Sequence, residues 1–204
     1  MVMMVNERQL KGLPAPATWS DLMQPQWKNK FAITDPSKSG TAYMLVYGLY
    51  KQFGQAGLDK IAANAVVTAS SGTTYKGVAA GEYAVGMTLE YAAQEYVAGG
   101  QKEIKLVYPS EGSYLAPEGM FIIKGAKNLD AAKALYDGLL SKASQEAQLV
   151  KNFRRPTRTD VAVASLTTLP DLSTVKIFPV SQEAAATEYE AVVAAWNQAV
   201  AQAK

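Results

Sequence analysis

The chain of 204 residues contains no cysteine and no histidine. Their absence excludes disulfide bonds, thiol nucleophiles, zinc sites of the Cys/His type and every catalytic triad that uses histidine. It also removes the side chain that most often transfers protons near neutral pH. A metal ion would have to be bound by oxygen ligands, which favours hard cations.

Net charge and long apolar runs are also scarce. Twenty basic residues against eighteen acidic ones leave a formal charge of +2, too little to indicate nucleic acid or a membrane surface as a partner. Apolar runs such as Met120–Ile123 are far too short to span a bilayer. The first eight residues lack the basic and apolar segments of a signal peptide, and residues 2–5 are expected to form a strand. With 49% hydrophobic residues, the chain is expected to bury a sizeable core in one large domain or two small lobes.

Residues 30–53 combine a short apolar strand, a polar loop and an amphipathic helix. The strand is predicted at Phe31–Thr34, and the loop runs through Asp35-Pro36 to Thr41. The apolar residues of the helix recur at the spacing of one buried face: Ala42, Leu45, Val46, Leu49, Tyr50 and Phe53. Ser37 or Ser39 is the predicted N-cap, and Gly54 and Gly57 are predicted to end the helix. Such a junction gathers free N–H groups at the positive end of the helix dipole, which favours an anion; an ordinary capped helix is the alternative.

Two further strands lead through polar residues into helices. A strand at Val66-Val67 is followed by the polar run Ala69–Thr74, which contains Ser70, Ser71 and Gly72, and then by a predicted helix at residues 75–80. A strand at residues 83–87 leads to Thr88. Strands that alternate with helices predict an α/β domain with a largely parallel sheet. Ligands of such sheets bind outside the carboxyl ends of the strands, and the three junctions are therefore expected to meet there.

The second half of the chain is less regular. A strand at residues 105–109 is followed by an irregular link, and a further strand is predicted at Met120–Lys124. Helices are predicted from Asn128 or Asp130, at residues 144–153, and from about Gln182 to the C-terminus.

Five sequence blocks resemble one family when their order and spacing are considered together. They are Pro16–Leu22 (PATWSDL), Asp35–Thr41 (DPSKSGT), Val78–Thr88 (VAAGEYAVGMT), Tyr108–Gly112 (YPSEG) and Gly125–Ala132. The family is the type 2 periplasmic substrate-binding proteins of ABC importers, in the branch that holds ferric-iron, phosphonate and sugar-phosphate binders. The resemblance implies a periplasmic-binding-protein type 2 fold with one complete lobe plus an incomplete second lobe. It further implies a periplasmic location, importer membrane subunits as partners, and no cofactor.

The resemblance also implies a division into lobes. Residues 1–6 would form the first hinge strand, 7–104 lobe two, 105–109 the second hinge strand, and 110–204 the returning C-terminal part of lobe one. Family members are usually longer, so the N-terminal part of lobe one would be missing. An exposed strand edge and apolar face would follow, which predicts a homo-oligomer, a strand-exchanged dimer or pairing with the missing piece.

The family resemblance assigns the ligand to the cleft between the lobes. Carried over by position, the candidate ligand-binding residues are Ser37, Ser39, Gly40, Thr41, Ser70, Ser71, Gly72, Thr88, Glu90 and Glu111. Their hydroxyl and N–H groups would bind phosphate or another oxyanion, and the carboxylates would accept sugar hydroxyls or pair with a ligand amine. The alternative for each serine and threonine is a cap or a turn. The expected ligand is a phosphorylated or phosphonate-bearing small molecule, with a sugar phosphate as the best single guess.

Other functions remain as alternatives. Ferric-iron members typically use two adjacent tyrosines near the third junction, where this chain has Thr88-Leu89-Glu90-Tyr91 and one tyrosine. Iron is therefore the second expectation for the ligand. The basic loop with Arg154, Arg155 and Arg158 lies away from the cleft in the family and is expected to be a solvated or packing loop. The sequence shows no nucleophile and no acid–base pair that would indicate an enzyme. A non-transporting sensor or interaction module of the same fold is a further alternative function.

Overall fold

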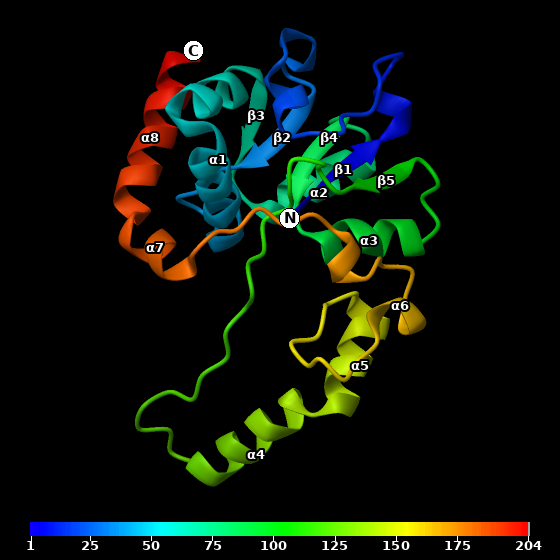
Figure 1. Cartoon of the computed structure of the whole chain (residues 1–204), viewed down its shortest axis with the longest axis vertical. Helices are drawn as coiled ribbons and strands as arrows, with labels where there is room; N and C mark the ends of the chain where they lie inside the picture. The colour runs from blue at the N-terminus through cyan, green and yellow to red at the C-terminus, as the bar shows by residue number, and fades with distance from the viewer. Residues whose placement is uncertain (204) are drawn as a thin grey trace. The chain divides into compact units, whose positions relative to one another are not determined.

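The computed structural model describes residues 1–203 and divides the chain into two compact units (Figure 1). The first unit contains Met1–Ala116 and the C-terminal segment that begins at Val175. The second unit is Pro117–Thr174.

The first unit is built on a five-stranded mixed sheet in the order β3-β2-β4-β1-β5. Its strands are β1 (Val2–Asn6), β2 (Phe31–Thr34), β3 (Ala65–Thr68), β4 (Val85–Thr88) and β5 (Ile104–Val107). β2 pairs in parallel with β3 and β4, whereas β1 pairs antiparallel with β4 and β5. Only β1 therefore runs against the other four, and the predicted α/β fold with a largely parallel sheet is confirmed.

Helices cover both faces of this sheet, because successive side chains of a strand point to opposite sides. Met3 and Val5 of β1 belong to the cluster with the helix α1 (Gly40–Asn64), and Val2 and Met4 belong to the cluster with α2 (Ser71–Ala80) and α3 (Glu90–Ala98). The central strands β1, β2 and β4 are buried along their whole length. The unit is thus a three-layer α/β structure.

The helix α1 differs from its prediction at the C-terminal end. Gly54 breaks the helical geometry, with φ 64° and ψ −166°, a conformation that glycine adopts readily because it has no Cβ atom. The chain then becomes helical again and continues to Asn64, so Gly57 does not end it. Leu58 and Ile61 are fully buried in the main core, which favours the second helical stretch.

Three 3₁₀ helices connect β1 to β2: η1 (Glu7–Gln9), η2 (Ser20–Met23) and η3 (Pro25–Trp27). They bury Leu22 and Trp27, and Trp19 immediately precedes η2. The indole N–H of Trp19 donates to the carbonyl of Gly112 at 2.9 Å, which anchors this connection to the chain after β5.

The C-terminal segment packs on the outer side of α1 (Figure 1). It consists of α7 (Gln182–Thr187) and α8 (Tyr189–Gln202), as predicted from Gln182 onward, with a short interruption at Glu188. Val192, Trp196 and Ala199 of α8 are buried in the main core. The compact unit therefore combines residues from Val175 onward with Met1–Ala116, while the family-based division into lobes stays a prediction.

The second unit is helical: α4 (Leu129–Leu140), α5 (Lys142–Asn152), the short α6 (Val163–Leu166) and the 3₁₀ helix η4 (Leu172–Thr174). Its small core contains Leu149, Val161 and Leu169. The strand predicted at Met120–Lys124 was wrong: these residues are irregular, and the described residues of this unit include no strand that could pair with them. Phe121 is 82% exposed as a result.

Candidate ligand site

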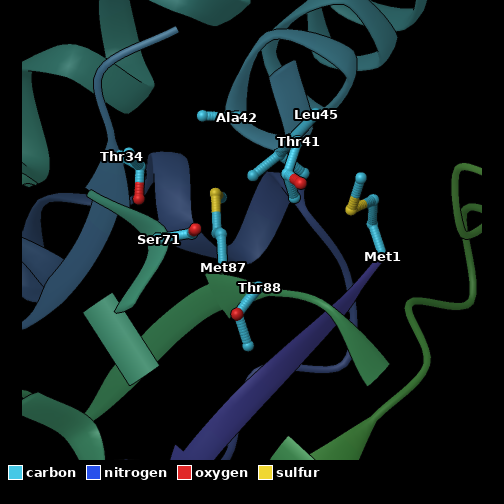
Figure 2. Close-up of a pocket in the computed structure, with 8 residues that line it drawn as sticks. All are labelled: Met1, Thr34, Thr41, Ala42, Leu45, Ser71, Met87 and Thr88. Carbon is cyan, nitrogen blue, oxygen red and sulfur yellow. The ribbon is translucent and has the colours of Figure 1, made fainter. Parts of the chain in front are cut away.

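A small pocket lies where β2 and β4 end and where α1 and α2 begin (Figure 2). It is lined by Met1, Thr34, Thr41, Ala42, Leu45, Ser71, Met87 and Thr88. Its cavity volume is about 10 Å³, on the order of one water molecule. One hydroxyl residue from each predicted junction lines it: Thr41 from the first, Ser71 from the second and Thr88 from the third. The pocket admits one oxygen-sized group.

Thr88 is the lining residue whose side chain most clearly lacks a protein partner. It is the last residue of β4 and is 2% exposed, and its Oγ1 has no hydrogen-bond partner in the structure. A buried hydroxyl without a partner costs about 1–3 kcal/mol in folding free energy. A ligand oxygen within hydrogen-bonding distance of this hydroxyl would remove that cost by forming the missing hydrogen bond.

The N-termini of α1 and α2 supply positive potential beside the pocket. Ser39 caps α1 by accepting from the N–H of Ala42 at 3.3 Å, and Ser70 caps α2 by accepting from the N–H of Thr73 at 3.1 Å. These two predicted ligand residues thus have the capping role that was their alternative explanation. The remaining first-turn N–H groups of each helix have no intrahelical acceptor, and the helix dipole makes them favourable for an anion.

The glycines of these helix starts leave room near the backbone. A Cβ atom placed on Gly40 would meet nothing within 4 Å, and one on Gly72 would meet only the hydroxyls of Ser70 and Tyr75 at 3.7 Å. The backbone of both first turns is therefore open to a ligand.

The other predicted residues have partners in the protein. The N–H and hydroxyl of Ser37 both donate to Asp35 Oδ1, at 2.8 and 2.7 Å, which shapes the loop before α1. Glu90, at the start of α3, accepts a hydrogen bond of 2.6 Å from the hydroxyl of Tyr108. Neither Ser37 nor Glu90 lines the pocket.

Glu111 also lies outside the pocket lining. One carboxylate oxygen accepts from the N–H of Ser20 at 3.1 Å, and the other accepts from the Ser20 hydroxyl. These contacts close the start of the 3₁₀ helix η2. They give Glu111 a structural role in this chain.

Sequence reasoning missed a cluster of three threonine hydroxyls next to the pocket. Thr34 Oγ1 lies 3.2 Å from Thr68 Oγ1 and 2.8 Å from Thr74 Oγ1, and the last two atoms are 2.7 Å apart. All three side chains are buried, and Thr34 also lines the pocket. Thr34 and Thr68 end two adjacent parallel strands in direct register. Two strands ending in threonine were the available signal, but their register was not known.

The basic loop belongs to the second unit and is held by its own contacts. Arg154 pairs with Glu118 at 2.5 Å, and Arg158 binds both carboxylate oxygens of Asp160 at 2.8 and 2.9 Å. Arg155 donates to the carbonyl of Pro170 at 2.8 Å. The hydrogen bond from Arg158 lowers the pKa of Asp160. These contacts are those of a packing loop.

Within residues 1–203, no group of three or more aspartate, glutamate, cysteine or histidine side chains is arranged to hold a metal ion. None of the helices in that range is both long enough and apolar enough to cross a membrane.

A family model described as "Bacterial extracellular solute-binding protein" matches residues 1–179. The chain belongs to this family. The resemblance to type 2 periplasmic substrate-binding proteins of ABC importers is thereby confirmed, together with their fold.

Curated relatives are about twice as long as the matching region. The chain is 28% identical over 198 residues to an uncharacterized protein of Haemophilus influenzae, which covers 93% of the chain and 56% of that protein. It is 33% identical over 171 residues to a putative 2-aminoethylphosphonate-binding periplasmic protein of Salmonella typhimurium, covering 76% of the chain and 49% of that protein. The chain thus spans about half the length of these relatives.

Solved structures agree with the fold. The periplasmic binding protein AfuA from Actinobacillus pleuropneumoniae, with exogenous fructose-6-phosphate bound, matches with a TM-score of 0.85 and 29% identity, over 98% of this chain and 65% of AfuA. Iron-bound HitA from Pseudomonas aeruginosa matches with a TM-score of 0.78 and 19% identity, over 97% and 66% of the two chains. A two-component system protein that mediates signal transduction matches with a TM-score of 0.83 and 24% identity, over 94% and 66%. The last two matches show the fold alone.

Proposed function

We propose that this chain is the solute-binding part of an ABC importer and captures a phosphorylated or phosphonate-bearing small molecule, with a sugar phosphate favoured. The observation that carries the proposal is the buried, unpartnered Oγ1 of Thr88, a residue that lines a pocket beside two helix N-termini. A phosphoryl or phosphonyl oxygen only accepts hydrogen bonds when ionised, and this pocket offers donors. The chain would act by binding and not by catalysis.

The size of the pocket defines which part of the ligand it would hold. About 10 Å³ accommodates one oxygen atom, whereas sites for whole small molecules measure about 300–1,000 Å³. One oxygen of the phosphorus group would enter between Thr41, Ser71 and Thr88, and the rest of the ligand would extend out of the pocket. The other phosphoryl oxygens would lie near the open first turns of α1 and α2.

The names of two relatives support a phosphorus oxyanion. One is a putative 2-aminoethylphosphonate-binding protein and the other is a structure with fructose-6-phosphate bound. These two ligands differ in their organic parts but share a tetrahedral phosphorus group. That shared group is what the site near Thr88 would recognise.

A thermal-shift experiment tests this proposal. Fructose 6-phosphate, 2-aminoethylphosphonate and inorganic phosphate would be compared with fructose, which lacks the phosphoryl group. A ligand that binds only the native state raises Tm. At a ligand concentration one hundred times its Kd, the free energy of unfolding increases by about 2.7 kcal/mol. We expect a rise with at least one phosphorus compound and none with fructose. No rise with any phosphorus compound would overturn the proposal.

Ferric iron is the second candidate ligand, and a sensor module is a further alternative function. Iron would need oxygen ligands, and Tyr91 at the start of α3 is the tyrosine nearest in sequence to the third junction. If only ferric iron raised Tm, iron would be assigned as the ligand in place of a phosphorus compound. Retained phosphate binding without stimulation of any importer in reconstituted vesicles would favour the sensor module.

The proposed partners are importer membrane subunits and a second copy of this chain. Exposed apolar side chains of the second unit support self-association: Phe121, Ile123, Leu129, Leu135 and Leu139. α4 buries none of its residues. A face of this kind is typical of an interface. The proposed location is the periplasm, which the names of the relatives support.

A further inference from the structure

The hydroxyls of Thr34, Thr68 and Thr74 form a closed triangle directly behind the pocket. Its sides measure 3.2, 2.8 and 2.7 Å, and Thr68 also lies 3.2 Å from the carbonyl oxygen of Ser70, to which it donates. The three side chains come from β2, β3 and α2. Of the three, only Thr34 lines the pocket, and Figure 2 shows its hydroxyl oxygen on the side toward Ser71.

The hydroxyl protons available to the triangle are fewer than its three O···O contacts of hydrogen-bond length. Each hydroxyl supplies one proton, and the Thr68 proton is used by the carbonyl of Ser70. Two protons, those of Thr34 and Thr74, remain for the three sides of the triangle. Since one side already lacks a proton, the protons of the network can be arranged in more than one way.

One of these arrangements turns the Thr34 proton into the pocket. In it, Thr74 donates to Thr34 Oγ1 across the 2.8 Å side, and Thr34 is free to donate to a ligand oxygen. The 2.7 Å side between Thr68 and Thr74 then carries no proton, a cost that the bond from Thr34 to a charged ligand oxygen would offset, and no buried O–H group is left without an acceptor. The bond from Thr74 also polarises the Thr34 hydroxyl, which strengthens it as a donor.

We propose that Thr34 is a further ligand-binding residue of the pocket and that Thr74 is a positioning residue that aims the Thr34 proton. This inference rests on the proposed function, because the acceptor is the ligand's phosphorus oxyanion. An oxyanion is the partner that fits, since it accepts hydrogen bonds from both Thr88 and Thr34. A ligand group that can only donate a hydrogen bond would face two donors, the hydroxyls of Thr34 and Thr88.

The competing explanation is that the triangle only fastens β2, β3 and α2 together. Both explanations predict lower stability when a threonine is replaced by valine, so stability alone does not separate them. The affinity of the folded variants does. Thr68 serves as the matched control, because its own proton goes to Ser70 and the Thr74–Thr34 bond survives without it.

Isothermal titration with fructose 6-phosphate, 2-aminoethylphosphonate and inorganic phosphate tests the inference on the full chain. Thr34→Val is expected to lower affinity about tenfold or more, because a hydrogen bond to a charged group is lost. Thr34→Ser is expected to restore it, and Thr74→Val is expected to lower it a few-fold. Thr68→Val is expected to leave the affinity within about twofold, although it lowers Tm.

A double-mutant cycle gives the decisive readout. Adding Thr74→Val to Thr34→Val should cause no further loss of affinity, because Thr74 acts through Thr34. Equal affinity of wild type and Thr34→Val, or an undiminished effect of Thr74→Val in the Thr34→Val background, would overturn the inference. If wild type binds none of the three compounds, the proposed function itself fails, and the two failures are thereby distinguished.

Discussion

The hydroxyl of Tyr43, in α1, donates a hydrogen bond to the backbone carbonyl of Ala185, in α7. The two residues are 142 positions apart, and the bond is buried. The Tyr43 ring also packs at 4.7 Å between centroids against Tyr189. This contact fastens the C-terminal segment to the helix whose N-terminus forms part of the candidate site.

The same contact predicts a stability change in alkaline solution. Burial, with the nearby Tyr47, Glu188 and Tyr189, raises the pKa of Tyr43 from 10.0 to about 12. Because the folded-state pKa is the higher one, the neutral phenol stabilises the fold fully below about pH 10, and this contribution is lost as the pH rises toward 12. Urea unfolding between pH 8 and pH 12 should show a steeper loss of stability for wild type than for Tyr43→Phe. Parallel profiles would contradict this account.

Replacing Gly48 and Gly138 by alanine is expected to change stability in opposite directions. A Cβ atom on Gly48 of α1 would lie 2.5 Å from the ring of Tyr114, which stacks on Trp19 at 5.5 Å. Gly48→Ala should therefore lower the free energy of unfolding by about 1–3 kcal/mol. The control is Gly138→Ala in α4, where a Cβ meets nothing within 4 Å and helix propensity should raise stability by about 0.5–1 kcal/mol. Chemical denaturation measures both, and a neutral Gly48→Ala would contradict the packing described.

The exposed face of α4 predicts self-association. Leu135 is 63% exposed, and Leu139 lies four residues further along the helix. Light scattering coupled to gel filtration should show a mass that rises with protein concentration, and Leu135→Glu should shift the equilibrium toward monomer because it buries a charge. Lys133→Glu, also on α4, is the control for added negative charge. A sharp monomeric peak at all concentrations, with cooperative thermal unfolding, would contradict the prediction.

The sequence was most informative where the pattern was local. Periodicity predicts the strand at Phe31–Thr34. Capping chemistry predicts an N-cap at Ser37 or Ser39, of which the structure uses Ser39, and the turn at Ser70 into a helix. The start of α2 was misjudged by four residues, since the polar run Ser71–Thr74 reads as loop while the structure makes it the first helical turn. A helix can begin with serine, glycine and threonine when the capping serine lies directly before them.

Features that depend on distant contacts could not be predicted. Gly54 interrupts α1 without ending it, because Leu58 and Ile61 bury the following turns in the core. The expected strand at residues 120–124 is apolar enough for a strand but has none to pair with in its unit. The register that brings Thr34 opposite Thr68 is set by strand pairing, so the threonine triangle was invisible in the sequence.

At the candidate site, the expected hydroxyl residues line the pocket more often than the carboxylates that were assigned by their position in the family. Thr41, Ser71 and Thr88 were expected at the site and line the pocket, whereas Glu111 binds Ser20 and lies outside the lining. Serines 39 and 70 are occupied as caps. Which hydroxyl is left without a partner depends on burial and neighbours in three dimensions.

The measurement that tests the central claim most directly is a comparison of wild type with Thr88→Val, with and without fructose 6-phosphate. Valine has the shape of threonine without the hydroxyl, and the Thr88 Oγ1 atom makes no hydrogen bond in the protein. The unliganded variant should therefore be as stable as wild type or more stable, by about 1 kcal/mol, while its ligand-induced rise in Tm largely disappears. A variant that keeps the full ligand-induced rise would contradict the assignment of this pocket as the oxyanion site.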